Sequence, residues 1–120
     1  MLLLTSTSDV IRVVTGTATS TIDVHASYVD ISGDTVTPGR TNTEITTATT
    51  TTVVASPAAS TQRNVKGLYI TNDSVGTNCD VRVEHSDGTT VVELMQFVLL
   101  PGENMTFNSD GTWRHRDKSW

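Results

Sequence analysis

Apolar and polar side chains alternate along most of this 120-residue chain. In one segment Ile22, Val24 and Ala26 are separated by Asp23 and His25. No segment spaces its apolar residues three and four apart over two or more turns, as an amphipathic helix would. Alternation at every second residue is typical of strands with one buried face. The pattern therefore predicts a protein built from β-strands.

Turn signals divide the chain into short segments. The expected strands cover residues 10–14, 22–28, 44–54, 64–71, 78–85 and 89–100, followed by two short strands at 105–107 and 112–116. The expected turns lie at Gly33-Asp34, Pro38-Gly39, Asp87-Gly88 and Asp110-Gly111, and the two Asp-Gly pairs suit tight hairpins. About seven to nine strands with regular turns predict a two-layer antiparallel β-sandwich, immunoglobulin-like or jelly-roll in type. At this length we expect one domain over residues 1–120.

Several strands allow the inward face to be assigned. Leu68 and Ile70 are expected to point into the core. In the segment 78–85 the inward residues are expected to be Cys79, Val81, Val83 and His85, and the outward residues Asp80, Arg82 and Glu84.

Two strands have less usual patterns. The threonine-rich run from Glu44 to Val54 is expected to be a single long strand, because β-branched threonine suits a pleated surface. The segment 89–100 has apolar residues on both faces: Val92, Leu94, Val98 and Leu100 on one, and Val91, Met95, Phe97 and Leu99 on the other. It is therefore expected to be a central strand, or one covered by another subunit.

Composition narrows the classes of partner. Only 36% of the residues are apolar and 5% aromatic, which is lean for a free-standing domain and favours support from an oligomer. The net charge of −5 disfavours nucleic acid as a direct partner. No stretch approaches the roughly 20 apolar residues of a membrane span. We expect a soluble protein that is made in the cytoplasm and has no membrane partner.

Catalytic and metal-binding signatures are not evident in the sequence. His25, His85 and His115 lie on three different expected strands without a close-spaced pair, so no metal site is predicted. There is no strained G-x-S-x-G turn and no phosphate-binding loop. The single cysteine, Cys79, is expected to be a small buried residue rather than a nucleophile. We therefore expect no enzyme activity and no cofactor.

The chain ends and the aromatic residues are the candidates for binding a partner. Trp113 and Trp120, with Tyr28 and Tyr69, could stack on sugar rings, although Trp113 most simply packs on its partner strand. Apolar side chains at both ends of the sequence favour an interface there. The predicted interface residues are Leu2, Leu3, Leu4, Trp113 and Trp120.

Six segments together resemble a group of small proteins encoded in the structural-gene regions of tailed bacteriophages. These segments are residues 3–9, 24–30, 35–43, 45–66, 85–94 and 110–113. The resemblance covers most of the chain, and its motifs are structural rather than catalytic. It transfers no active-site residue.

The resemblance implies a component of the virion. The leading hypothesis is a capsid decoration, or cement, protein on the outer surface of the head, which binds the major capsid protein as a homo-oligomer, with a trimer favoured. A tail or neck component is the alternative within the structural class. A carbohydrate-binding module on the virion surface, using Trp113 or Trp120, is an alternative from a different class.

Overall fold

The chain forms ten β-strands and no helix over residues 1–117, the part that the computed structural model describes. The strands are β1 (Leu2–Leu4), β2 (Val10–Thr15), β3 (Ile22–Ser32), β4 (Thr35–Ile45), β5 (Thr50–Val54), β6 (Gln62–Asn72), β7 (Cys79–Ser86), β8 (Val91–Leu99), β9 (Asn104–Phe107) and β10 (Trp113–Arg116).

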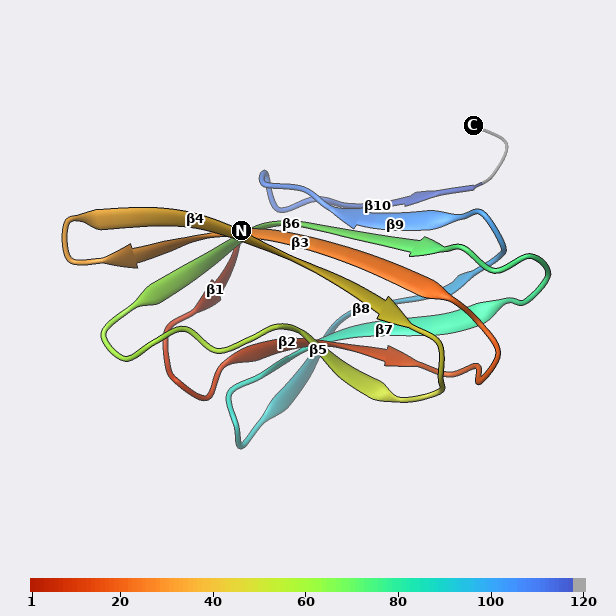
Figure 1. Cartoon of the computed structure of the whole chain (residues 1–120), viewed down its shortest axis with the longest axis horizontal. Coiled ribbons are helices and arrows are strands. Elements are labelled where there is room, and N and C mark those ends of the chain that lie inside the picture. The colour runs from red at the N-terminus through yellow and green to blue at the C-terminus, as the bar shows by residue number, and fades with distance from the viewer. Residues whose placement is uncertain (118–120) are drawn as a thin grey trace.

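The strands form two sheets that pack face to face (Figure 1). Sheet A has the order β10-β9-β6-β3-β4, and β1 pairs with β6 along the same edge as β9. Sheet B has the order β5-β2-β7-β8. Every strand pair is antiparallel. The predicted all-β, two-layer antiparallel sandwich is confirmed.

Three hairpins stay within one sheet, whereas most other connections cross between the sheets. The hairpins are β3–β4 and β9–β10 in sheet A and β7–β8 in sheet B. The crossing connections among residues 1–117 follow β1, β2, β4, β5, β6 and β8. Because successive strands alternate between layers, each layer is built from parts of the chain that are distant in sequence.

The core lies between the sheets and consists of the inward residues of both. Sheet A contributes Leu4, Ile22, Val24, Ala26, Ile45, Val65, Leu68, Ile70, Met105 and Phe107, and sheet B contributes Ile11, Val13, Val53, Val54, Cys79, Val81, Val83 and Leu99. Leu68 and Ile70 point inward as predicted, and so do Cys79, Val81 and Val83. The period of two in the sequence therefore located the core-facing residues of β6 and β7 correctly.

The threonine-rich segment is two strands rather than the predicted single strand. The chain bends at residues 46–49, so that Ile45 ends β4 in sheet A and Thr50 begins β5 in sheet B. Thr15 holds the bend, since its hydroxyl donates to the Thr47 carbonyl at 2.6 Å and its backbone N–H donates to Thr49 at 2.9 Å. The bend carries the chain across the core, which places both Ile45 and Val53 in it.

The predicted turn at Pro38-Gly39 is wrong, because both residues lie inside β4. β4 is an edge strand, where proline is tolerated because one side of the backbone has no partner strand. Gly39 makes room for the ring of Tyr28 on the neighbouring strand. A Cβ atom at residue 39 would lie 2.6 Å from Cε2 of that ring.

The segment predicted to be a central strand, or one covered by another subunit, is β8; it is an edge strand of sheet B, so the first alternative is wrong and the second stays a prediction. The pairing of β7 with β8 shifts between Val83 and Glu84, which makes Leu94 the extra residue of a bulge. The bulge exchanges the expected faces at the start of β8. Val92 pairs with His85, which in turn pairs with the buried Ile11, so Val92 lies on the inward face.

Candidate functional site

The predicted interface residues that the structure describes, Leu2, Leu3, Leu4 and Trp113, lie on strands at one side of β6, where β1 and β9 pair with β6 and β10 pairs with β9. Leu2 pairs with Val65 in β6, and Phe107, the partner of Trp113, pairs with Leu68. Leu4 is completely buried in the core, Leu2 packs partly against it, and Leu3 is exposed.

Trp113 packs on its partner strand. Its ring lies 4.9 Å from that of Phe107, at an interplanar angle of 51°. Leu4 has no free surface to offer a partner, and Trp113 is half-buried, so Leu3 is the member of the set most open to solvent. Trp120 lies outside the described residues.

Exposed apolar side chains lie at both ends of β8. Val91 and Val92 are at its start, and Val98 and Leu100 are at and just after its end; we call these four residues the β8 apolar surface. Val98 is 52% exposed and Leu100 is 42% exposed. These side chains lie at the free edge of sheet B, where the outer side of the β8 backbone pairs with no other strand of residues 1–117.

A charged cluster lies on the outer face of sheet B, on strands β2 and β7. Glu84 accepts a hydrogen bond from Arg12 Nη2 at 2.9 Å and forms an ion pair with Arg82 Nε at 3.1 Å. Glu84 lies on the outer face, as the sequence predicted, but the two arginines leave it only 7% exposed. This burial could not be predicted from the sequence, because Arg12 belongs to a strand 72 residues away.

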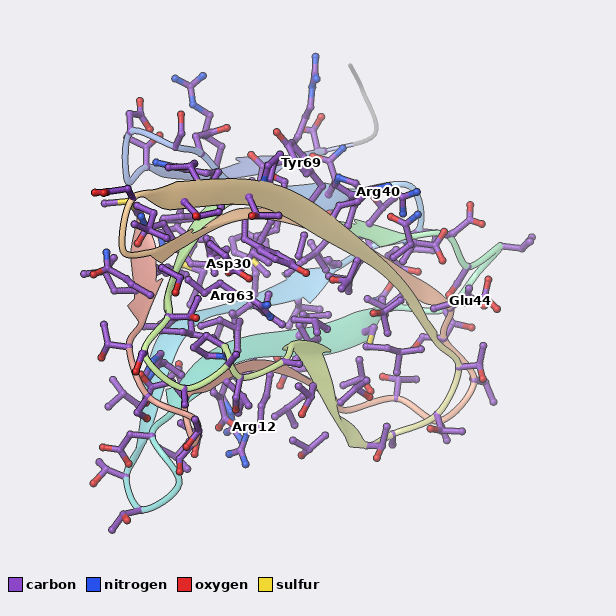
Figure 2. All side chains as sticks on the ribbon, turned by 60° about the vertical axis from the view of Figure 1, so that its left-hand side comes forward. Arg12, Asp30, Arg40, Glu44, Arg63 and Tyr69 are labelled. Atoms are coloured by element: carbon purple, nitrogen blue, oxygen red, sulfur yellow. The ribbon has the colours of Figure 1, made fainter. Side chains whose placement is uncertain are left out.

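A second charged cluster ties sheet A to the connection between β5 and β6 (Figure 2). Arg63 donates two hydrogen bonds to Asp30, at 2.8 and 2.9 Å, and a third to the Ala55 carbonyl at 2.9 Å. Its guanidinium also lies 4.0 Å from the centre of the Tyr28 ring. The hydrogen bonds from Arg63 lower the pKa of Asp30, despite its partial burial. This cluster has all its partners within the domain and therefore has a structural role.

The three histidines do not converge. His25 is on β3, His85 on β7 and His115 on β10. His115 stacks on Phe97 of β8, with 3.8 Å between ring centres, and its Nε2 lies 3.0 Å from Glu103. The pKa of Glu103 is lowered first by the backbone N–H of Leu100 and then by His115. This contact joins the β8 edge of sheet B to the β10 edge of sheet A.

The described residues offer no evident metal centre or membrane span. Within residues 1–117, no group of three or more histidine, cysteine, aspartate or glutamate side chains is placed to hold a metal ion. The same residues include no helix of the length and hydrophobicity that a bilayer span requires.

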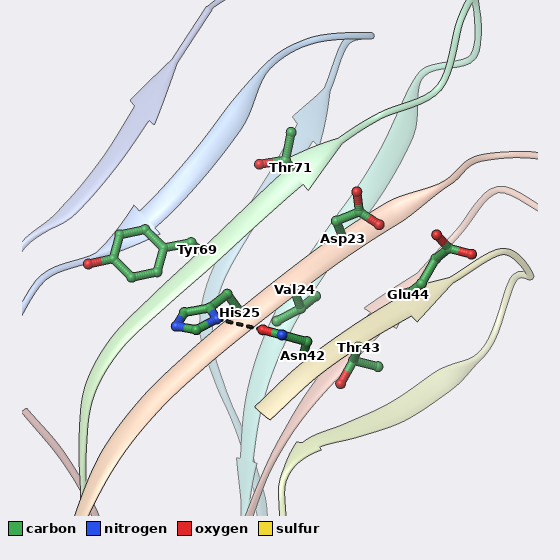
Figure 3. Close-up of a pocket in the computed structure, with 8 residues that line it drawn as sticks. All are labelled: Asp23, Val24, His25, Asn42, Thr43, Glu44, Tyr69 and Thr71. Carbon is green, nitrogen blue, oxygen red and sulfur yellow. Dashed lines mark hydrogen bonds between the residues drawn. The ribbon is translucent and has the colours of Figure 1, made fainter. Parts of the chain in front are cut away.

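A cleft of about 440 Å³ lies on sheet A, across strands β3, β4 and β6 (Figure 3). It is lined by Asp23, Val24, His25, Asn42, Thr43, Glu44, Tyr69 and Thr71. The pKa of Asp23 is raised, first by burial and then by the nearby charges of Asp73 and Glu44. Six of the lining residues are polar side chains of the outer face of the sheet, whereas Val24 and Thr43 lie on its inward face.

Tyr69 was predicted from the sequence only as one of four aromatic residues that could stack on sugar rings, and this cleft was not predicted. One local signal was present in the sequence, since Gly67 and Tyr69 are two residues apart on one strand and must share a face. The other lining residues come from β3 and β4, and their position relative to Tyr69 depends on the strand order.

Comparisons with protein-family models, with curated proteins and with solved structures give no match for this chain.

Proposed function

We propose that this chain is a structural protein of a tailed-bacteriophage particle, a capsid decoration protein that binds the major capsid protein as a symmetric oligomer. The sequence resemblance supports the phage assignment. The β8 apolar surface is the structural observation that favours a binding role, because three exposed valines lie on an unpaired edge strand and the exposed Leu100 follows it directly.

An unpaired, apolar edge strand is a liability for a free monomer. Its open N–H and C=O groups can pair with another chain, and natural proteins normally protect such edges with charged residues, proline or a covering element. β8 carries a single charged residue, Glu93, and no proline. Burial against a capsid subunit or a neighbouring copy would remove this apolar surface from water.

The proposal is tested with heads assembled from the major capsid protein of the phage that encodes this chain. Purified chain is added to heads that lack it, and the bound amount is measured by sedimentation and electron microscopy. Val98→Asp places a charge in the β8 apolar surface and is expected to reduce occupancy at least about tenfold. Val36→Asp is the matched control, since Val36 is 63% exposed on the β3–β4 hairpin of the other sheet.

The outcomes separate the alternatives. Binding that is lost in Val98→Asp and retained in Val36→Asp supports the proposal. No binding of the unaltered chain to heads, together with its recovery on purified tails or necks, overturns the decoration role in favour of the tail or neck role. Equal binding by both variants and the unaltered chain shows that the β8 apolar surface takes no part.

A further inference from the structure

Tyr69 has the placement of a stacking platform. It lies on the outer face of sheet A and is 47% exposed. Its ring leans back along β6 over Gly67, where a Cβ atom would lie 3.2 Å from Cε2 of the ring. Because Gly67 has no side chain, the ring can lie close to the sheet (Figure 3), and about half of the Tyr69 side chain stays exposed.

Polar groups surround this ring on the neighbouring strands. His25 is directly opposite Tyr69 in the β3–β6 pair, with 5.8 Å between ring centres. Its Nδ1 lies 2.6 Å from Asn42 Oδ1, which places the proton of a neutral His25 on Nδ1 and leaves Nε2 free to accept a hydrogen bond. The Asn42 amide nitrogen has no hydrogen-bond partner among residues 1–117.

The far end of the cleft carries carboxylates and hydroxyls. Asp23 pairs with Glu44 across β3 and β4, and with Thr71 across β3 and β6. Neither Asp23 nor Glu44 forms an ion pair within residues 1–117. The cleft therefore combines one exposed aromatic face with planar polar groups that can hydrogen-bond to adjacent hydroxyl groups of a ligand.

We propose that this cleft binds a neutral saccharide, with one sugar ring stacked on Tyr69 and its hydroxyl groups bonded to Asn42, His25 and the carboxylates. A sugar ring presents C–H groups on its faces, which suit the negative face of an aromatic ring, and hydroxyls at its rim. The carboxylates disfavour acidic sugars and phosphates. The cleft is open to solvent, whereas an apolar ligand would need an enclosed pocket.

This site is separate from the surface proposed for capsid binding. The cleft lies on the outer face of sheet A, whereas the β8 apolar surface lies at an edge of sheet B. A decoration protein with such a cleft would display it on the outside of the particle. Either proposal can fail without the other, because each is tested by substitutions on a different sheet.

The test is a nuclear magnetic resonance titration of the full, isotopically labelled chain with neutral trisaccharides of glucose, galactose and mannose. A single shallow subsite corresponds to a dissociation constant on the order of 1 mM, so the trisaccharide concentration is raised to roughly ten times that value. The expected result is a saturable shift of the Tyr69 ring and His25 signals for at least one trisaccharide.

Three variants check that the cleft is responsible. Tyr69→Ala is expected to weaken binding at least about tenfold. Gly67→Ala keeps every polar group but adds a Cβ 3.2 Å from both the Tyr69 ring and Ser27 Oγ, so the ring must lift and binding is expected to weaken. Gln62→Ala alters an exposed residue of the same strand outside the cleft and should leave the affinity unchanged.

Three results would overturn the proposal. The first is the absence of saturable shifts in the cleft with all three trisaccharides. The second is unchanged affinity in Tyr69→Ala, with its spectrum showing an intact fold. The third is a shift of the cleft by a lysine-rich peptide, abolished by salt, when the trisaccharides have no effect; that result would make the cleft a protein-docking site.

Discussion

Replacement of Asn72 by alanine should be one of the most destabilising polar substitutions in this protein. Asn72 ends β6 and is completely buried. Its side-chain nitrogen donates to the Leu99 carbonyl at 2.8 Å and to the Thr77 carbonyl at 2.9 Å. Its side-chain oxygen accepts the Ser74 N–H at 3.0 Å. One side chain therefore ties the β6–β7 connection to the end of β8 in the opposite sheet.

The magnitude follows from the burial of each bond. The bond to Leu99 is fully buried, so the abandoned carbonyl costs about 1–3 kcal/mol. The bonds to Thr77 and Ser74 are partly exposed, and water can replace part of each, which leaves about 0.5–1 kcal/mol apiece. The sum is about 2–5 kcal/mol, a large fraction of the roughly 5–15 kcal/mol that stabilises a typical domain.

Urea denaturation at one fixed protein concentration, followed by tryptophan fluorescence and circular dichroism, measures this loss. With a slope of about 2 kcal/mol/M, the midpoint of Asn72→Ala should fall by about 1–2.5 M. Asn78→Ala is the matched control, because Asn78 is an exposed residue of the same connection and should change stability by less than about 0.5 kcal/mol. Equal midpoints for the two variants would refute the assigned role of Asn72.

Three further substitutions test other parts of the structure. Asp23→Asn should raise the free energy of unfolding at pH 7 and leave it unchanged near pH 3. The raised pKa of Asp23 means that its ionised carboxylate lowers the stability of the folded state at pH values above that pKa. Urea denaturation that shows equal effects at both pH values would contradict this. In Asp30→Asn the free energy of unfolding should fall less steeply below about pH 4 than in the unaltered chain. The lowered pKa of Asp30 reflects stabilisation by Arg63, which is lost as the pH falls through the pKa of Asp30. An unchanged dependence of stability on pH would show that the ion pair contributes nothing. Gly39→Ala should lower the melting temperature by displacing the Tyr28 ring, and an unaltered melting temperature would show that the ring moves freely.

The regular parts of the fold could be predicted from the sequence because alternation has a direct physical cause. A strand with one buried face must place apolar residues at every second position, so Leu68 and Ile70, and likewise Cys79, Val81 and Val83, point inward as expected. The Asp-Gly pairs also mark real hairpins, since Gly88 and Gly111 have φ values of 93° and 87°.

The errors arise where distant contacts decide the local structure. The threonine run bends because Thr15, more than 30 residues earlier, binds the carbonyls of the bend. Pro38 sits inside a strand because that strand is at a sheet edge, and edge position is a property of the strand order. The faces at the start of β8 exchange because of a bulge, which alternation alone does not reveal.

The candidate sites were predicted less well than the strands. Apolar residues on both faces of the segment 89–100 predicted a central strand or one covered by another subunit; the strand is at an edge, and its cover by another subunit stays a prediction. The tryptophans were predicted from the sequence to be the leading sugar-stacking residues. In the structure Trp113 packs on Phe107, whereas Tyr69 is exposed and lies over Gly67. Which aromatic ring faces solvent depends on its neighbours across the sheet, and a single sequence does not give them.

A reconstruction of the intact particle by electron cryomicroscopy tests the central proposal most directly. We expect copies of this β-sandwich on the outer surface of the head, arranged about a symmetry axis. The β8 apolar surface should be buried against the major capsid protein or a neighbouring copy. Density for the chain in the tail or neck, or on the head with β8 facing solvent, would contradict it.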